Sequence, residues 1–540
     1  MTLLDTSTTT PSVQRMASPR RVTAILAMTG MAVSIMQTLV IPILPSLPKI
    51  LHTHPANSTW VLTVTLLVGA VFTPISGRLG DMFGKRRILL ISVSTMVIGS
   101  VFCALSNSLA PMLIGRGLQG MSLGSIALGI SLMRDTLPRE RLASAVALMS
   151  ATLGIGGAVG LPLSAMVAEK LSWHYLFWGS TVIGVIAMIG IARSIPESTI
   201  KTGGRFDFVG AAGLSIVLVS LLFGLSKSTD WGWGDPKQLA LFAVAAIVFV
   251  AWSRYELRSK APLINIRTSI RRVVLFTNLT SILIGFAMYT LNLVMTQLLQ
   301  APDGTGLGFG QSMIVAGLCS APMGIAMMLV SPLAARIIVR FGPRFALRLG
   351  SLVIACGFIY AAFFLEHVWE ALIVAAATGV GIAIAYAAMP TIIMRSVPTT
   401  ETAAANSVNT LSRSLGTSLA AAVHGAIIAV AFASSAAHPE IMHHHSFTAF
   451  DLCFLLGAIS CVLAIVVASF IPKDRKDTQP LVLDLDVLAD LEGVAGIEMD
   501  RDLLDTHHDR RASVLIREAR PRSVVRRRPA ARPRSHARRR

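Results

Sequence analysis

The chain has 540 residues, of which 53% are hydrophobic and only 14% are charged. A water-soluble protein of this length needs more charge to cover its surface, so the composition excludes an ordinary soluble domain and indicates a membrane protein. The net charge of +19 would suit a nucleic-acid-binding protein, but 13 of the 47 Lys and Arg residues follow Asp509 and most others lie in short loops. That distribution is typical of an orientation signal in a membrane protein.

Runs of about 20 apolar residues, the length that crosses a bilayer, recur fourteen times along the chain. They begin near Val22, Asn57, Ile88, Met112, Ala143, Tyr175, Phe208, Gln238, Val273, Gln311, Phe345, Trp369, Ala403 and Phe447. We therefore predict an all-α polytopic membrane protein with fourteen spans. Its predicted parts are a tail over 1–21, a six-helix half over 22–195, two inserted helices over 206–253, a second six-helix half over 272–471 and a tail over 472–540.

The charges in the loops give an independent check on this topology. With alternating sides, the loops on the side of the two tails hold 21 Lys and Arg, whereas the opposite loops hold four. A wrong span count would scramble this asymmetry, because every later loop would change sides. We therefore predict that both termini are cytoplasmic and that the protein lies in the cell inner (plasma) membrane.

One loop motif recurs along the chain. The segment between the second and third runs reads Gly77-Arg-Leu-Gly-Asp81-Met-Phe-Gly84-Lys85-Arg86-Arg87. A weaker copy between the tenth and eleventh runs reads Ala335-Arg336-Ile-Ile-Val339-Arg340-Phe341-Gly342-Pro343-Arg344. The copies fall at equivalent places in the two predicted halves, as in transporters whose halves rock around a central site.

The first copy resembles the hallmark cytoplasmic loop of the major facilitator superfamily. Three further tracts make roughly residues 20–472 similar to the fourteen-helix EmrB/QacA-type drug:proton antiporters: Phe206-Asp207-Phe-Val-Gly210, Trp231-Gly-Trp233 and Pro262-Leu263-Ile264. The resemblance implies that Asp81 latches the cytoplasmic side against the helix that begins near Thr402. Gly77, Gly84, Lys85 and Arg86 belong to the same gating loop. A simpler interpretation is that the basic residues only face lipid phosphates.

Arg116 lies inside the fourth run, within Arg116-Gly-Leu-Gln119-Gly120. A charged side chain in a membrane costs at least roughly 2.5–3.5 kcal/mol and marks function by default. Arg116 and Gln119 share one helix face, and the resembled family carries a similar Arg-x-x-Gln-Gly that is implicated in proton handling. The alternative is an arginine that extends toward the membrane surface from near a helix end.

The fifth run contains the small residues Gly156, Gly160 and Ser164 at intervals of four, with Pro162 between the last two. Such a stripe allows helices to pack closely. It partly matches the antiporter motif of the superfamily, although Leu161 and Ser164-Ala165 depart from that pattern. Both interpretations, a gating motif and a packing stripe, stay open.

Two further runs carry polar faces. In the ninth, Asn278, Gly285, Tyr289, Asn292 and Thr296 recur at helical spacing, and in the thirteenth Asn406, Arg413, Thr417 and His424 do so. Polar side chains at such depth either hold helices together or line an aqueous cavity. We expect Asn292 and Arg413 to line the proton or substrate pathway; for Tyr289 and His424 the two roles are equally open.

The first run departs from the family pattern. Related antiporters carry an acidic residue where this chain has Met36. Gln37 is the nearest polar group, and we expect it to line the proton or substrate pathway. A membrane carboxylate usually binds both protons and cationic drugs, because it can be neutral or charged. Its absence makes a neutral or anionic cargo as plausible as a cationic one.

The sequence predicts a secondary active transporter, which exports amphiphilic drugs or toxic small molecules in exchange for protons. The alternatives are an exporter of an endogenous neutral or anionic metabolite or lipid, and a non-transporting receptor or scaffold. The sequence has no nucleotide-binding loop and no catalytic constellation. We therefore expect that the protein is not an enzyme and that it binds no cofactor, metal or nucleic acid. His443, His444 and His445 have no second ligand cluster. We expect a monomer whose Arg-rich tail binds anionic headgroups or its own acidic stretch.

Overall fold

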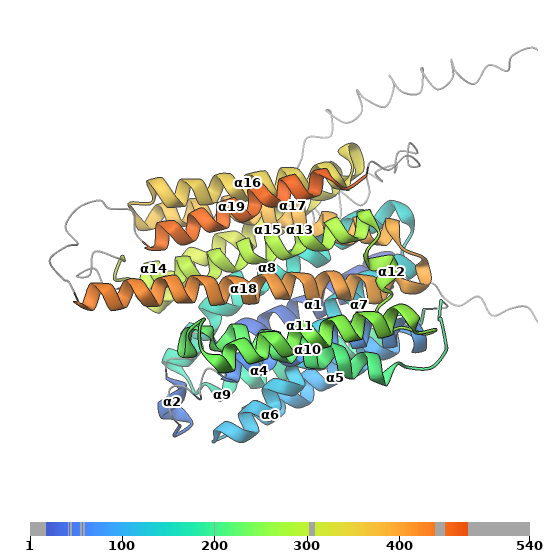
Figure 1. The fold of residues 1–540 in the computed structure, drawn as a ribbon, viewed down its shortest axis with the longest axis horizontal. Helices are drawn as coiled ribbons and strands as arrows, with labels where there is room; N and C mark the ends of the chain where they lie inside the picture. The colour runs from blue at the N-terminus through green and yellow to red at the C-terminus, as the bar shows by residue number, and fades with distance from the viewer. Residues whose placement is uncertain are drawn as a thin grey trace, which may run out of the picture. The chain divides into compact units, whose positions relative to one another are not determined.

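The computed structural model describes residues 18–472, except 42, 44, 45, 54–56, 58, 59, 199, 302–307 and 438–448. The tail after Pro472, residues 1–17 and the histidines at 443–445 therefore lie outside the described residues. The described chain is all-helical, as predicted (Figure 1).

The helices follow the apolar runs of the sequence. The first part comprises α1 (Pro19–Thr38), α2 (Leu47–Ile50), α4 (Trp60–Phe83), α5 (Lys85–Ala104), α6 (Leu109–Gly120), η1 (Met121–Gly124), α7 (Ser125–Thr136), α8 (Arg139–Lys170) and α9 (His174–Ser194). Next come α10 (Phe208–Trp231), α11 (Pro236–Arg258) and α12 (Ile266–Ser269). The last part comprises α13 (Arg272–Thr290), η2 (Leu291–Met295), α14 (Thr296–Gln300), α15 (Met313–Phe341), α16 (Pro343–Phe364), α17 (Val368–Ser396), η4 (Thr399–Glu401), α18 (Thr402–Ala437) and α19 (Ala449–Ser469).

Among the described residues, twelve helical segments are long and apolar enough to cross a membrane. The two other predicted spans fall on α1 and on the segment α6–η1–α7, where a 3₁₀ turn divides the helix into pieces of 12 residues. The expected start of every span lies within four residues of a helix start. The count of fourteen spans and the cytoplasmic termini stay predictions.

The two copies of the loop motif fold alike. Gly84 separates α4 from α5 with φ of 113°, and Gly342 separates α15 from α16 with φ of 86°. Only glycine adopts such angles without strain. The repeat inferred from sequence therefore corresponds to a repeated helix–glycine–helix junction in the fold.

Three groups of buried apolar side chains organise the helices. One consists mainly of residues of the first part, such as Leu26, Val93 and Leu132. A larger group consists mainly of residues of the helices from α13 through α19. A third packs the inserted helices against α4 and α18 through residues such as Leu214 and Leu411. Of the inserted pair, α10 thus contacts one helix of each predicted half.

Candidate functional site: a polar latch between two helix ends

Asp81 on α4 and the start of α18 form a polar contact between the two predicted halves. The carboxylate of Asp81 accepts the backbone N–H of Ala403 at 3.2 Å and that of Ala404 at 2.8 Å. These N–H groups have no partner within α18, because they belong to its first turn. The helix dipole further favours a negative charge there. We call this contact, together with Lys85 and Asp135, the Asp81 latch.

Gly77 makes the close approach of α4 and α18 possible. A Cβ atom at this position would lie 2.2 Å from the Ser407 hydroxyl oxygen and 2.7 Å from the Ala403 carbonyl oxygen. Such distances are far below van der Waals contact, so only glycine fits. Gly77 and Asp81 are one helical turn apart, which places the small residue and the carboxylate on the same face of α4.

Lys85 links Asp81 to a second carboxylate, that of Asp135 on α7. Its Nζ lies 2.6 Å from Asp135 Oδ2 and 3.6 Å from Asp81 Oδ1, and all three side chains are buried. A buried carboxylate or ammonium group is costly unless it is paired. The cluster therefore contains two acids, one lysine and the positive end of a helix, which together come close to neutrality.

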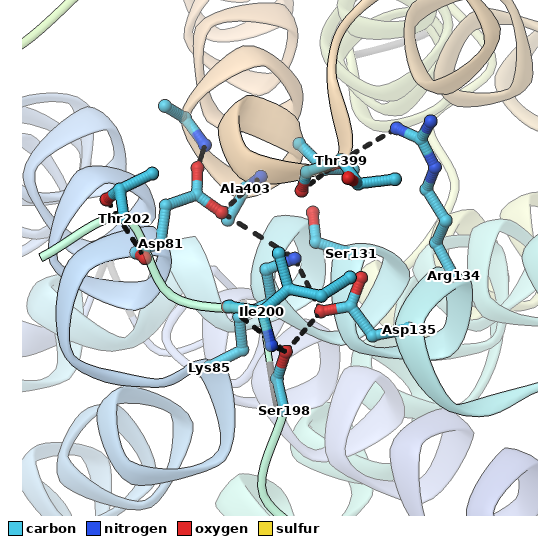
Figure 2. Close-up of polar contacts among 12 residues, drawn as sticks. Asp81, Lys85, Ser131, Arg134, Asp135, Ser198, Ile200, Thr202, Thr399 and Ala403 are labelled. Carbon is cyan, nitrogen blue, oxygen red and sulfur yellow. Dashed lines mark hydrogen bonds and ion pairs between the residues drawn. The ribbon is translucent and has the colours of Figure 1, made fainter.

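Arg134 adds a second bridge at this end of the bundle (Figure 2). Its guanidinium donates to the Thr402 hydroxyl at 2.8 Å and to the Val397 carbonyl at 3.3 Å. One turn away, Asn406 donates to the Ser131 hydroxyl at 3.2 Å. Every one of these contacts joins α7 to the segment from the end of α17 to α18, so they break together if the halves separate here.

Arg116 is fully buried between α1, α4 and α6. Its guanidinium donates to the carbonyls of Val61 and Met36, at 3.1 and 3.3 Å, and to Gln119 Oε1 at 2.7 Å. Gln119 in turn donates to the Ser100 hydroxyl at 2.8 Å. The sulfur of Met36 lies 3.6 Å from the guanidinium. Within the described residues Arg116 thus has no acidic partner, and Met36 faces it.

Arg413 on α18 is a second buried cation. Its guanidinium contacts Asn409 Oδ1 at 3.3 Å and Thr410 Oγ1 at 3.2 Å, and its central carbon lies 4.9 Å from the centre of the Tyr386 ring. Such a cation–π contact stabilises a charge without neutralising it. In the described part of the chain no carboxylate pairs with Arg413 either.

The remaining predicted pathway residues lie on α1, η2, α13 and α18. His424 Nε2 forms a hydrogen bond of 2.7 Å with the Thr290 hydroxyl, and its Nδ1 is buried without a partner. Asn292 donates to the Met288 carbonyl of its own helix at 3.0 Å, inside the π-helical turn η2. Gln37 and Tyr289 are half-buried. These four residues do not meet at a common point through any of these contacts.

The small residues of α8 contact α1. A Cβ at Gly156 would lie 2.0 Å from the Ser34 hydroxyl oxygen, and one at Gly160 would lie 2.1 Å from the Thr38 hydroxyl oxygen. Both hydroxyls also donate to backbone carbonyls of α8. On another face α8 meets α15, where Gly317 lies near Pro162. Helix α8 therefore packs against α1 on one face and against α15 of the other predicted half on another face.

Several residues of this region were not predicted from the sequence, among them Asp135, Glu197 and Ser198. Glu256 was also missed, because α11 continues past Trp252 to Arg258 and so places this acid, 2% exposed, in its last turn. One signal was available: Pro196-Glu197-Ser198 follows directly on the sixth span.

The described chain is a bundle with twelve helical segments able to cross a membrane and a polar contact between α4 and α18, an architecture typical of membrane transporters. A sequence model of the Major Facilitator Superfamily matches residues 26–421 and 277–529. The chain belongs to this superfamily, as its loop motif suggested.

Several relatives carry names of drug exporters. The chain is 24% identical over 402 residues to the multidrug resistance protein Stp of Mycobacterium tuberculosis, covering 74% of this chain and 73% of the relative. It is 28% identical over 331 residues to the tetracenomycin C resistance and export protein of Streptomyces glaucescens, covering 60% of this chain and 60% of that relative. It is 25% identical over 453 residues to the putative multidrug resistance protein MdtD of Pectobacterium atrosepticum, covering 81% of this chain and 92% of that relative. The protein is thus a multi-pass transporter of the inner membrane.

Solved structures have the same fold. The human organic anion transporter MFSD10 aligns with a TM-score of 0.61 at 16% identity, over 84% of this chain and 99% of that one. The proton:xylose symporter XylE aligns with a TM-score of 0.57 at 13% identity, over 84% of this chain and 96% of that one.

Proposed function

We propose that this protein exports amphiphilic drugs or other toxic small molecules by alternating access, in exchange for protons. The proposal rests on the Asp81 latch, because this contact joins α4 of one predicted half to α18 of the other through two hydrogen bonds. Contacts of this kind hold one conformation closed at one end and are lost when the halves rock the other way. The names of the multidrug resistance relatives support the cargo class.

In the proposed cycle the latched conformation is closed at the predicted cytoplasmic end. Opening this end separates Asp81 from the first turn of α18 and Arg134 from Thr402. Lys85 then becomes the remaining cation near Asp81, at an initial distance of 3.6 Å. The carboxylate thus exchanges one positive partner for another, which keeps the two conformations close in free energy.

Proton coupling has no carboxylate at the usual position in the first span, where Met36 stands. We place it instead at the latch, where Asp81 and Asp135 share Lys85. A proton on Asp81 removes the charge that holds the start of α18. A proton that reaches Asp81 from the external side therefore favours opening of the cytoplasmic end, and its release to the cytoplasm favours closure.

A second candidate is export of an anionic or neutral metabolite or lipid. It is favoured by Arg116 and Arg413, two buried cations that lack an acidic partner among the described residues. An anionic cargo near either guanidinium would gain the Coulomb energy that no protein carboxylate supplies. A cationic cargo would be repelled. The two candidates share the fold and the latch, and differ only in the charge of the cargo.

Transport in proteoliposomes tests both candidates. A cationic dye and an anionic amphiphile of similar size are compared with a proton gradient imposed and after the gradient is collapsed. Uptake of either compound that needs the gradient supports proton exchange, and uptake that persists at the same rate without it contradicts the proposal. The ratio of the two initial rates distinguishes the cargo classes.

We also propose that the protein acts as a monomer, with both termini in the cytoplasm and its Arg-rich tail on anionic lipid headgroups. Basic residues near such a surface contribute about 1 kcal/mol each. The tail lies outside the described residues, so deletion after Pro472 tests its role. A transporter stays active without the tail, whereas a receptor or scaffold that signals through it does not.

A further inference from the structure

The linker between α9 and α10 is bound to the Asp81 latch. The backbone N–H and the hydroxyl of Thr202 both donate to the Asp81 carbonyl oxygen, at 2.8 and 3.1 Å (Figure 2). The Ser198 hydroxyl donates to Asp135 Oδ2 at 2.6 Å, the same oxygen that binds Lys85. The linker therefore contacts the backbone of Asp81 and the carboxylate of Asp135.

Glu197 supplies a helix cap that α5 lacks. The residue before α5 is Gly84, which has no side chain to accept a hydrogen bond from the first turn. The Glu197 carboxylate takes this place, accepting the N–H of Arg86 at 3.1 Å. A Cβ atom at Gly84 would lie 2.7 Å from Glu197 Oε1, so the glycine also leaves room for this acid. A carboxylate at a helix N-terminus is stabilising.

Lys85 is the first residue of α5 and therefore moves with the turn that Glu197 holds. Its ammonium group lies 1.0 Å nearer to Asp135 than to Asp81, as the distances of 2.6 and 3.6 Å show. If the ammonium group moved to Asp81, it would compensate the charge that α18 now binds. The position of Lys85 thus decides whether Asp81 favours the start of α18.

We propose that Glu197 and Ser198 are positioning residues of the latch: Glu197 fixes the first turn of α5 and Ser198 fixes Asp135, so that Lys85 stays on Asp135 and Asp81 is left for α18. The proposal rests on the alternating-access function proposed above and adds the linker to its gate. Loss of either contact releases Lys85 toward Asp81 and weakens the latch.

The bound part of the linker ends at two glycines. Gly203 and Gly204 have φ of 62° and 91°, and a Cβ at either would meet nothing within 4 Å. These glycines serve a backbone conformation rather than packing. Three residues later Asp207 caps α10 by accepting the Gly210 N–H at 2.7 Å. The linker is therefore fixed at the latch and turns sharply before the inserted helices begin.

Distance measurements between spin labels test the proposal without requiring transport. Labels are attached to cysteines at the exposed positions Arg87 and Arg340, one in each half, after the exposed native Cys356 is changed to Ser. In lipid nanodiscs, the distance distribution gives the populations of the open and the closed conformation. Glu197→Ala and Ser198→Ala are expected to raise the ratio of the open to the closed population at least about fivefold. Glu197→Gln keeps a hydrogen-bond acceptor and should restore much of the closed population. Lys201→Gln, at an exposed linker position, should change nothing.

The outcomes separate the two proposals. If Asp81→Asn opens the labelled end but the two alanine variants do not, the role of the linker is wrong and the latch stands. If Asp81→Asn also has no effect, the latch and the alternating-access cycle built on it are wrong. Ser198→Ala removes a single oxygen, so it keeps the test valid should Glu197→Ala fail to fold. In transport, the alanine variants should lower turnover with an unchanged KM.

Discussion

Asp81 on α4 accepts the backbone N–H of Ala404 on α18 at 2.8 Å, although the two residues are 323 positions apart in sequence. The carboxylate thus acts as a helix cap supplied by the opposite half of the protein. A cap can be exchanged for water at modest cost, because substitution of such a residue typically costs about 0.5–2 kcal/mol. This range suits a contact that forms and breaks in each cycle of the proposed alternating-access mechanism.

Replacement of Asp81 by Asn removes the charge at the start of α18 but keeps the shape of the side chain. We expect the closed population of this end to fall about tenfold, since roughly 1.4 kcal/mol corresponds to that factor. The labelling of a cysteine at Ser407 by a water-soluble reagent should become faster, because opening exposes this buried position. Glu140→Gln, an exposed acid at the start of α8, is the matched control and should leave the labelling rate unchanged.

Gly416 is expected to tolerate no side chain. A Cβ there would lie 1.9 Å from the Ile282 carbonyl oxygen, so Gly416→Ala must push α18 away from α13. Overpacking of this kind costs about 1–3 kcal/mol, and the Tm of the purified protein should fall by several degrees. Gly179→Ala in α9, where nothing lies within 4 Å, is the control and should leave the Tm unchanged or raise it. Equal Tm values for the two variants would contradict the close packing.

Met36→Asp restores an acid at the position where related antiporters carry one. The new carboxylate would face Arg116, whose guanidinium lies 3.6 Å from the Met36 sulfur. The local charge then changes from positive to near neutral, so the rate of anionic relative to cationic transport should fall about tenfold. Met36→Asn introduces a side chain of the same size as aspartate but without its charge. This variant should leave the ratio of anionic to cationic transport rates unchanged. A ratio that is the same in both variants would remove Arg116 from cargo selection.

His424→Gln distinguishes the two roles that the sequence leaves open for this histidine. The ring is fully buried, contacts Phe286 at 4.9 Å between ring centres and bonds to Thr290. We expect a structural role, so the pH profile of transport should keep its shape while stability falls by about 1 kcal/mol. A profile that shifts or flattens in this variant would instead identify His424 as a group that binds the transported proton.

The fold was largely predictable because bilayer thickness and the charge of loops impose strong regularities on sequence. Helix starts near Val22 or Phe345 follow from hydropathy alone. The polar sites were only partly predictable. Arg116 could be found because a charge within an apolar run is rare, and Asp81 because its glycine-rich loop resembles a known motif.

Asp135, Glu197 and Ser198 could not be assigned in this way. Each lies near the end of an apolar run, where a polar residue needs no special explanation. Their importance depends on contacts across 50 to 111 residues of sequence, as between Lys85 and Asp135 or between Arg86 and Glu197. No periodicity connects such pairs, so only the folded structure brings them together.

The placement of glycines along α8 limits how this transporter can change over evolution. Gly156 and Gly160 leave no space toward α1, and Gly154 faces Met327 of α15 at 2.2 Å from a Cβ position. Most substitutions there would block movement before they altered what is carried. New cargo preferences should therefore arise on other helices, and a compound that packs beside α8 should inhibit transport whatever the cargo.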